Sequence, residues 1–363
     1  MTQTLTSSSD LAARLAAGGP VRIVGGGTRA GWGSPVEGAE ALPTAGLDRI
    51  VEHSEGDFTA ILEAGVTVER AQEQFAAAGQ MLALDPPGAP GVTIGGLVAT
   101  GDSGPRRHRY GGPRDLVIGV TVALPDGTLA KAGGKVIKNV AGYDLSKLMS
   151  GAFGTLGVIT QVAVRLHPLP EATATARFGF DDPDRLGAVA AGLAHRPLEL
   201  EALDVAYAGG EGAVLARFAG TTAIERCTAL DGFETIEDDE AIWVGQRAAQ
   251  RSADGTVVRV SALPTELPDV LRAADEAGAR VAGRAGAGIF YLSLPGAARE
   301  EVELLRSDLS PAACVVLDAP AELRAALDPW GVADGSELSL ARRVKERFDP
   351  QRVCNPGIYL GGI

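Results

Sequence analysis

Glycine is concentrated in residues 87–160, where it interrupts short apolar runs every few positions. Each glycine costs conformational entropy on folding, so a packed core does not favour so many of them. Glycine is favoured where the backbone turns through positive φ or lies flat against a ligand. Because these turns are spread over three separate segments, they predict one extended ligand lying along the protein, such as a dinucleotide.

The overall composition is that of an ordinary globular protein, with 363 residues, 45% of them hydrophobic and 22% charged. A chain of this length can bury a large core and is expected to form two domains. The formal net charge of −13 argues against nucleic acid as a main partner and against adhesion to an anionic membrane surface. No apolar run reaches the roughly 18 residues that span a bilayer, so we expect no integral membrane segment.

The three cysteines, Cys227, Cys314 and Cys354, are far apart in the sequence. Because no Cys-x-x-Cys pair is present, the sequence predicts no iron–sulfur or other metal site in this chain. An odd number of cysteines suits a reducing compartment, and the N-terminal residues lack the basic start of a signal peptide. We therefore expect a cytoplasmic protein.

Residues 1–170 are expected to form a first domain, which ends at Pro168 and Pro170. Its predicted elements are a helix over 11–17 that Asp10 caps, strands over 21–24, 47–53 and 58–63, a helix over 68–78 that Thr67 caps, strands over 117–124 and 158–166, and a helix over 144–149 that Asp144 caps. From residue 88 to 164 we expect strands and glycine turns to alternate, with Asp126-Gly127 as a hairpin turn.

Residues 171–327 repeat the order β-α-β-β-α-β nearly twice. This pattern predicts two ferredoxin-like halves that form one antiparallel sheet with helices on one face, and therefore an α+β fold. The predicted strands cover 173–180, 199–207, 213–218, 256–262, 280–284, 289–294 and 313–317, and the predicted helices cover 183–193, 221–230, 267–277 and 300–309. Residues 328–363 hold an amphipathic helix over 338–348 and an apolar tail that we expect to dock on the protein.

The first glycine motif, Gly25-Gly26-Gly27-Thr28, directly follows a predicted strand and begins a G-x-G-x-x-A match. A Rossmann fingerprint needs a helix to start there, and Gly33 and Pro35 forbid a regular helix, so we reject that interpretation. Consecutive glycines can instead form a nest of backbone N–H groups that binds phosphate. An ordinary surface turn is the alternative.

A second segment places Thr93, Gly95, Gly96 and Thr100 in the apolar run T-I-G-G-L-V-A-T. The paired glycines suggest backbone that approaches a flat or phosphorylated group, and a β-bulge is the alternative. The basic cluster R-R-H-R-Y-G-G follows at residues 106–112. It suits a phosphate, a carboxylate or an acidic partner, and a solvated loop is equally compatible with it.

A third segment, residues 138–160, contains a predicted short helix, the run G-A-F-G-T-L-G and a buried strand. This order is expected to bring backbone groups of Val158 and Ile159 to the edge of a ring system. Lys138 and Asp144 lie where a polar network is plausible, and helix capping alone is the alternative for Asp144.

As an ordered set, these motifs resemble the vanillyl-alcohol-oxidase, or PCMH-type, superfamily of FAD-binding proteins. The set is V-G-G-G-T, D-P-P-G, T-I-G-G-L-V-A, R-D-L-V-I-G-V, K-N-V-A-G-Y-D-L-S-K-L, G-A-F-G-T-L-G-V-I-T and F-D-P-Q-R-V-C-N-P-G. Within the superfamily, S-G-P-R-R and D-P-W-G favour the FAD-binding subunits of bacterial glycolate oxidases. The resemblance implies a PCMH-type FAD-binding domain over residues 1–170, a cap domain over 171–327, and a C-terminal segment, 328–363, that returns to the FAD domain.

The resemblance also implies which residues contact FAD. Residues 25–28 would contact the pyrophosphate. The middle of the cofactor would be lined by Pro86, Gly88, Thr93, Gly95, Gly96 and Thr100. Its adenine side and ring edge would be contacted by Gly154, Gly157, Val158 and Ile159. Relatives with covalent flavin use a His or Cys, for which no matching residue is evident, so we expect non-covalent FAD.

One departure from the superfamily concerns the catalytic base. Its catalytic 2-hydroxy-acid dehydrogenases carry a segment H-x-H-x-G-D-G-N, whereas the four histidines of this chain are isolated. Because hydride transfer from a hydroxy acid needs a group that removes the hydroxyl proton, the catalytic residue stays unknown. Arg259 and Arg284, on predicted cap strands, suit a substrate carboxylate, although a lone arginine on a strand more often serves solubility.

The resemblance therefore predicts an FAD-dependent oxidoreductase component, the FAD-binding subunit of a multi-subunit glycolate oxidase that converts glycolate to glyoxylate and passes electrons on. It implies a homologous catalytic FAD subunit and an iron–sulfur subunit as partners, through which the chain would reach the inner membrane. Two alternatives are a self-sufficient FAD-dependent 2-hydroxy-acid dehydrogenase and a flavin-free structural subunit.

Overall fold

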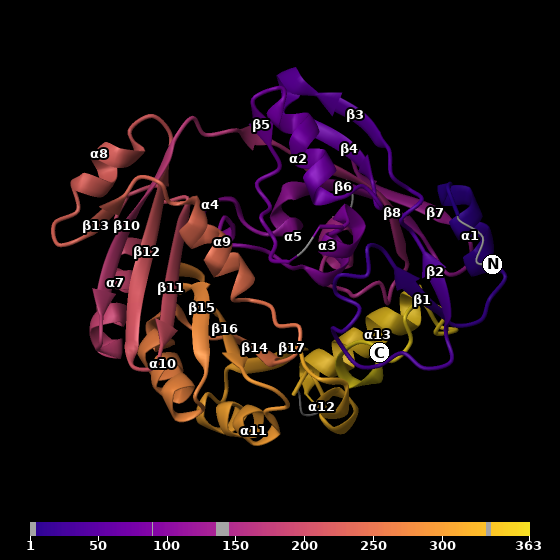
Figure 1. Ribbon diagram of the computed structural model, residues 1–363. Helices are drawn as coiled ribbons and strands as arrows, with labels where there is room; N and C mark the ends of the chain where they lie inside the picture. The colour runs from indigo at the N-terminus through magenta and orange to yellow at the C-terminus, as the bar shows by residue number, and fades with distance from the viewer. Residues whose placement is uncertain (1–4, 89, 136–144, 332–334) are drawn as a thin grey trace.

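The computed structural model describes residues 5–88, 90–135, 145–331 and 335–363 of the chain. Two antiparallel sheets organise these residues, one with five strands and one with eight (Figure 1). We call residues 5–170 the five-stranded unit and residues 171–327 the eight-stranded unit. The residues after 327 form a C-terminal segment that lies beside the strands of the N-terminal part in Figure 1.

The five-stranded sheet has the order β3-β4-β8-β6-β7. Its strands are β3 (Ile50–Ser54), β4 (Thr59–Glu63), β6 (Val117–Ala123), β7 (Leu129–Gly133) and β8 (Val158–Arg165). The strands predicted over 117–124 and 158–166 are confirmed, and β6 and β7 form a hairpin on either side of Asp126-Gly127. A two-stranded sheet joins β5 (Gln80–Met81) to β9 (His167–Pro168).

Short helices cover this sheet and enclose its core. They are α2 (Val68–Ala76), α3 (Ile94–Thr100), α4 (Arg107–Tyr110), α5 (Pro113–Leu116) and α6 (Leu145–Met149). Thr67 caps α2 as predicted, because its side chain accepts a hydrogen bond from the Arg70 amide. Buried side chains of α2 and α3, including Phe75 and Leu97, pack with Leu62 and Val162 of the sheet. The predicted cap of α6, Asp144, lies outside the described residues.

A small parallel pair of strands, β1 (Val21–Val24) and β2 (Glu40–Pro43), precedes the five-stranded sheet. The helix before it, α1 (Ser8–Ala16), begins earlier than predicted because Ser7 caps it in place of Asp10. Leu11 of α1 is fully buried in a cluster that includes Val353 and Cys354 of the C-terminal segment. The first and last parts of the chain therefore share one core.

The eight-stranded sheet consists of two halves with the same topology, in the overall order β13-β10-β12-β11-β15-β16-β14-β17. The first half contains β10 (Thr173–Phe180), α7 (Pro183–Ala194), β11 (Ala202–Ala208), β12 (Glu211–Ala219), α8 (Ala223–Thr228) and β13 (Glu234–Ile236). The second contains β14 (Thr256–Ser261), α10 (Leu267–Glu276), β15 (Arg280–Arg284), β16 (Ile289–Leu294), α11 (Arg299–Asp308) and β17 (Ala313–Asp318). The two halves join through antiparallel pairing of β11 with β15, so the predicted ferredoxin-like halves are confirmed.

The two faces of this sheet are covered differently. Buried residues of α7, α8, α10 and α11 pack on one face in a single large core. The other face carries α9 (Glu240–Ala248), whose Trp243 packs against Ala213 and Leu215. The prediction of helices on one face therefore holds for the four helices of the repeat, and α9 is an addition that the pattern did not reveal.

The C-terminal segment contains α13 (Ser336–Phe348), which follows the short α12 (Ala321–Ala326). Near the end of α13, the buried ammonium of Lys345 donates to the carboxylate of Asp349, 2.7 Å away, and to the carbonyls of Thr155 and Cys354. Asp349 also accepts the backbone N–H groups of Val353 and Cys354. This buried pair fastens the C-terminal segment to the third glycine segment.

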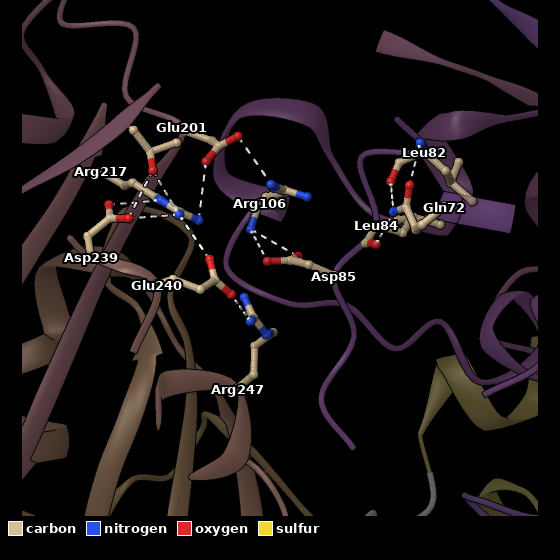
Figure 2. A network of polar contacts seen from close by, with 11 residues as sticks. Gln72, Leu82, Leu84, Asp85, Arg106, Glu201, Arg217, Asp239, Glu240 and Arg247 are labelled. Atoms are coloured by element: carbon tan, nitrogen blue, oxygen red, sulfur yellow. Dashed lines mark hydrogen bonds and ion pairs between the residues drawn. The ribbon is translucent and has the colours of Figure 1, made fainter. Parts of the chain in front are cut away.

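Charged side chains cross the junction between the two units, as Figure 2 shows. Asp85 accepts the Arg106 amide, and Arg106 Nε lies 3.3 Å from Oε1 of the fully buried Glu201. The other oxygen of Glu201 lies 3.6 Å from Arg217 Nη1, and Arg217 Nη2 donates to Asp239 at 2.9 Å. Because a buried charge without a partner is costly, this chain of pairs favours one orientation of the two units.

Arg284 is fully buried at the same junction. Its Nη2 donates to the Ser103 carbonyl at 2.6 Å and to Gln250 Oε1 at 2.7 Å, and its Nε donates to the Gly104 carbonyl at 3.2 Å. Asp204 stands opposite Arg284 in the β11–β15 register and is also fully buried. Burial raises the pKa of Asp204 to about 7, although the charge of Arg284 acts in the other direction.

Replacing Lys345 should destabilise the whole fold. In Lys345→Met the carboxylate of Asp349 loses its buried cation, which we expect to lower the free energy of unfolding by about 3–5 kcal/mol. Urea denaturation followed by circular dichroism measures the change. The control is Arg343→Met on the exposed side of the same helix, which should change stability by less than about 0.5 kcal/mol. Equal stability of the two variants would contradict the assigned role.

The raised pKa of Asp204 predicts a pH dependence of stability. Between about pH 4 and pH 7 the unfolded chain has released this proton and the folded protein keeps it, so stability falls as pH rises. Asp204→Asn removes this dependence. Its stability relative to wild type should increase with pH over that window, by at most about 1.4 kcal/mol per pH unit.

Urea denaturation of Asp204→Asn and wild type at several pH values measures this difference. The exposed Asp254→Asn serves as the matched control and should follow the wild-type curve at every pH. Parallel curves for wild type and Asp204→Asn would show that Asp204 ionises normally in the folded protein.

Candidate cofactor-binding site

A single cleft runs between segments that are far apart in the sequence. It is lined by residues from 22–30, 92–100 and 153–159, together with Asn355 and Ile358 of the C-terminal segment. The cleft is narrow, with a cavity volume of about 120 Å³. The three glycine segments therefore meet along one cavity.

The first glycine loop follows β1 and packs directly on the loop that leads into α3. A Cβ atom on Gly26 would lie 1.7 Å from the carbonyl oxygen of Gly91, and one on Gly25 would lie 2.4 Å from Thr93 Oγ1. No side chain can be placed in so small a space without moving the backbone. Gly25 and Gly26 are therefore required here for the close approach of two backbone segments.

The second glycine segment forms helix α3, whereas strands alternating with glycine turns were expected, with a β-bulge as the alternative for the paired glycines. Thr93 begins the helix, because its Oγ1 accepts the Gly96 amide at 3.3 Å. Gly95 lies against β4 and its following turn, since a Cβ atom there would be 2.6 Å from Ala64 Cβ. Gly95 thus lets a short helix approach the sheet closely, and residues of the same helix line the cleft.

Asn355 joins the first and third segments at one end of the cleft. Its Oδ1 accepts the Ile23 amide at 2.7 Å, and its Nδ2 donates to the Phe153 carbonyl at 2.6 Å. Its own amide donates to the Val21 carbonyl at 2.9 Å. One side chain therefore holds the end of β1 against the turn that precedes β8.

Arg29 joins the first segment to the second. Its guanidinium donates to Oδ2 of the buried Asp102 at 2.6 Å, to Thr28 Oγ1 at 2.8 Å and to the Pro87 carbonyl. From the eight-stranded unit, Arg251 donates to the Thr28 carbonyl at 3.0 Å. The G-G-G-T loop is consequently anchored from both units.

The structure brings most of the predicted cofactor residues into this cleft. Those that line it are Gly25, Gly26, Gly27, Thr28, Thr93, Gly95, Gly96, Thr100, Gly154, Gly157 and Ile159. Val158 is buried in the core shared by the first and last parts of the chain. Pro86 and Gly88 lie on the loop that Arg29 holds through Pro87. Lys138 and Asp144 lie outside the described residues.

Several cleft residues were not singled out from the sequence. They include Arg22, Arg29, Thr44, Phe153, Asn355 and Ile358. Two carry a recognisable signal, since Arg29 directly follows G-G-G-T and Asn355 belongs to the terminal N-P-G motif. The others reach the cleft through tertiary packing, which no local pattern reports.

A second cavity, of about 250 Å³, adjoins the cleft, because Thr100 and Phe153 line both. Arg259 and Arg107 contribute to its wall. The two arginines predicted to bind a carboxylate are therefore placed differently: Arg259 reaches a cavity, whereas Arg284 is committed to protein carbonyls at the junction.

The basic cluster at residues 106–112 is divided among several contacts at the junction. Arg106 pairs with Glu201, and Arg109 donates to the Glu199 carbonyl at 2.6 Å. His108 packs against Gly286, and burial, with a smaller effect of Arg109, lowers its pKa. The interpretation of this cluster as a solvated loop is therefore wrong for Arg106 and His108, which are only partly exposed.

In the residues that the structure describes, no helix has the length and apolar character required to cross a bilayer. The same part of the chain holds no cluster of three or more His, Cys, Asp or Glu side chains suited to a metal ion.

Comparison with known proteins agrees with the prediction that this part of the chain binds a dinucleotide. Residues 5–133 match the family described as FAD binding domain. Glycolate oxidase subunit GlcE of Escherichia coli is 36% identical over 263 residues, which are 69% of this chain and 70% of that protein. Glycolate oxidase subunit GlcD of Bacillus subtilis is 36% identical over 166 residues, which are 46% of this chain and 35% of that protein.

Solved structures show the same fold. An alkyldihydroxyacetonephosphate synthase superposes with a TM-score of 0.66 at 16% sequence identity. The aligned region covers 96% of this chain and 75% of the synthase chain. At that identity the similarity concerns the architecture alone, and it extends over both sheets. Together with the similarity to subunit GlcE, it confirms the PCMH-type fold. The chain therefore belongs to the family of FAD-binding oxidoreductases that includes glycolate oxidase subunit GlcE, and FAD is its cofactor.

Proposed function

We propose that this chain is the FAD-binding subunit of a multi-subunit glycolate oxidase, and that it does not itself oxidise glycolate. Its partners would be a homologous catalytic FAD subunit and an iron–sulfur subunit, in the cytoplasm or at the inner membrane through those partners. The observation that carries the proposal is a backbone-lined cleft in a chain similar to subunit GlcE, with no H-x-H-x-G-D-G-N segment.

The cleft suits a long, flat nucleotide held without a covalent bond. The close approach of Gly26 to Gly91 keeps side chains out of the space between the first two segments. We assign residues 25–28 to the pyrophosphate, Thr93 and Thr100 to the middle of FAD, and residues 154–159 to its adenine side and ring edge. When bound, FAD accepts hydride and passes electrons one or two at a time. The protein's own residues bind it, orient it and exclude water.

The proposed division of the chain into three parts is consistent with FAD binding by its first and last parts. We propose an FAD-binding domain over residues 1–170, a cap domain over 171–327 and a C-terminal segment over 328–363. Asn355 and Lys345 of that last segment contact residues of the first and third glycine segments. The C-terminal segment would thus complete the cofactor domain after the cap.

A second candidate function is a self-sufficient FAD-dependent 2-hydroxy-acid dehydrogenase. The cavity with Arg107 and Arg259 beside the cleft favours it, because guanidinium groups bind carboxylates. The two functions differ in whether glycolate reduces the flavin of the isolated chain.

The visible spectrum of the purified chain tests the proposed function. We expect a bound, yellow flavin that denaturation releases, and no bleaching when glycolate is added without oxygen. Rapid bleaching by glycolate would support the second candidate function. A folded chain with no flavin absorbance, even after incubation with FAD, would contradict both candidate functions. The flavin-free structural subunit would then be the remaining alternative.

A side chain at position 26 should weaken FAD binding. In Gly26→Ala the new Cβ atom must displace the first loop or the Gly91 carbonyl, since it would lie 1.7 Å from that oxygen. We expect FAD affinity to fall at least about tenfold, which corresponds to about 1.4 kcal/mol. Flavin content after dialysis and FAD titration of the apoprotein measure the effect.

Gly192→Ala is the matched control for this experiment. Gly192 lies in α7 with no atom within 4 Å of an added Cβ, and it is far in sequence from the cleft segments. Its flavin content should equal that of wild type. If Gly26→Ala retains full affinity while folding normally, the first loop is not part of the FAD site.

A further inference from the structure

One face of the eight-stranded sheet is covered only in part. Helices α7, α8, α10 and α11 pack on the first face, and on the second half of the other face Val257 packs with Trp32 and Trp330. On the first half of that other face, α9 covers some of the strands, and a groove remains beside it. Of the described residues that line this groove, none belongs to the five-stranded unit or the C-terminal segment. The groove therefore opens to solvent.

The alternation of the strands determines the floor of the groove. Successive side chains of a strand point to opposite faces, and Val205 and Val214 belong to the core under the helices. Gly179 of β10, Ala213 of β12 and Ala206 of β11 therefore point to the other face, where they form one row of the register and line the groove. Because these side chains are short, the floor is low and apolar, and the cavity volume above it is about 830 Å³.

Helix α9 forms the wall of the groove and exposes an apolar surface. Val244 is 50% exposed, and no atom lies within 4 Å of a Cβ atom added to Gly245, which lines the groove. After Glu240, the exposed positions of the helix are Ala241, Val244, Gly245 and Ala248. The outer side of a surface helix normally carries polar or charged residues, and this one carries none. An apolar helix face beside an apolar groove is typical of a surface that contacts another protein.

The charges at the rim of the groove differ between its two ends. Asp181 and Glu211 line the end formed by β10 and β12, and Arg280 lines the end formed by β15. Arg177 already pairs with Glu234 at 3.1 Å, whereas no ion pair within the described residues neutralises the other three. An α-helix has partial positive charge at its N-terminus and partial negative charge at its C-terminus. A helix that begins near the two carboxylates and ends near Arg280 matches this pattern.

The size and direction of the groove also suit a helix. Its floor crosses β10, β12, β11 and β15, so it extends about 14 Å, the length of about nine helical residues. Helix α9 runs the same way, since Asp239 before it contacts Thr175 of β10 and Gln250 after it contacts Arg284 of β15. A second helix parallel to α9 would complete the layer on this face. The small residues of α9 allow the two helices to approach closely.

We propose that this groove docks an amphipathic helix of a partner protein, with the N-terminus of that helix near Asp181 and Glu211 and its C-terminus near Arg280. The inference rests on the proposed function for the identity of the partner, another subunit of the oxidase complex. It goes further by assigning the contact to a surface that shares no residue with the cofactor cleft. Apolar contact supplies the affinity, and the rim charges set the orientation.

Gly245→Arg tests the assigned surface. The added side chain extends into open space, so the fold should persist, and replacing a glycine within a helix should not lower stability. It fills the groove and places a charge on its apolar wall. We expect the flavin-loaded variant to bind the purified pair of catalytic FAD and iron–sulfur subunits at least about tenfold more weakly than wild type. Biolayer interferometry measures the affinity, and the visible spectrum should show unchanged flavin content.

Gly192→Arg is the matched control for this variant. Gly192 is an exposed glycine within α7, on the opposite face of the sheet, and it also has no atom within 4 Å of an added Cβ. This variant should bind the pair of subunits as wild type does. Equal losses in the two variants would show that an added arginine weakens binding wherever it lies, and would overturn the assignment.

Charge reversal at the rim tests the orientation of the docked helix. Arg280→Glu should slow association about fivefold at low salt and less than about twofold at 1 M salt, where screening is nearly complete. Glu211→Lys should have the same effect from the other end. The exposed Arg299→Glu, on α11 of the opposite face, is the control and should leave the rate unchanged. Faster association in Arg280→Glu would overturn the orientation.

The outcomes separate this inference from the proposed function. Tight binding of the pair of subunits that Gly245→Arg leaves unchanged overturns the docking surface and leaves the proposed complex intact. A wild-type chain that binds flavin and does not bind the pair contradicts the proposed complex and this inference together. A wild-type chain that dimerises alone, and that Gly245→Arg makes monomeric, would show that a second copy occupies the groove, and would overturn the partner assignment.

Discussion

The attachment of the C-terminal segment is the constraint on which the cofactor cleft depends. Lys345 and Asp349 form a buried pair whose remaining hydrogen bonds all go to backbone groups, including the Thr155 carbonyl. The same segment places Asn355 between Ile23 and Phe153. Two stretches that are more than a hundred residues apart are thereby held at a fixed spacing. Without this fastening, β1 would have only β2 as a partner, and an isolated pair of short strands is marginally stable.

The cofactor cleft and the cavity beside it are lined differently, the first largely by glycine-rich loops and the second largely by side chains. Along the cleft, close packing of loops excludes side chains, as at Gly26. At the cavity beside it, the two-residue period of β14 brings Arg259 out of the hydrophobic layer. The two regions meet at Thr100 and Phe153. These two residues therefore form the boundary between the backbone-lined cleft and the arginine-lined cavity.

Local sequence patterns predicted the strands and helices that bury side chains at regular intervals. They failed for helices that bury few residues, or whose formation depends on contacts with distant parts of the chain. The strand over 21–24 and both ferredoxin-like halves follow from periodicity and turn residues. Helix α9 was missed because its buried residues are only Trp243 and Gln246, which is too few for a visible stripe. Helix α3 was missed because two glycines lower its helix propensity, and the Thr93 cap with packing on Ala64 compensates for them. The cavity could not be foreseen, since its residues come from three distant stretches.

The anchoring of Thr28 by arginines from opposite sides has a consequence for how the protein matures. Arg29 ties this loop to Asp102 and Pro87, and Arg251 ties it to Asp318 of the eight-stranded unit. A nucleotide that binds this loop in its native arrangement therefore also stabilises the contacts between the two units, since any ligand that binds only the native form stabilises it by mass action. A chain that holds the nucleotide would then unfold less often than one that lacks it, and would expose its backbone to proteases less often.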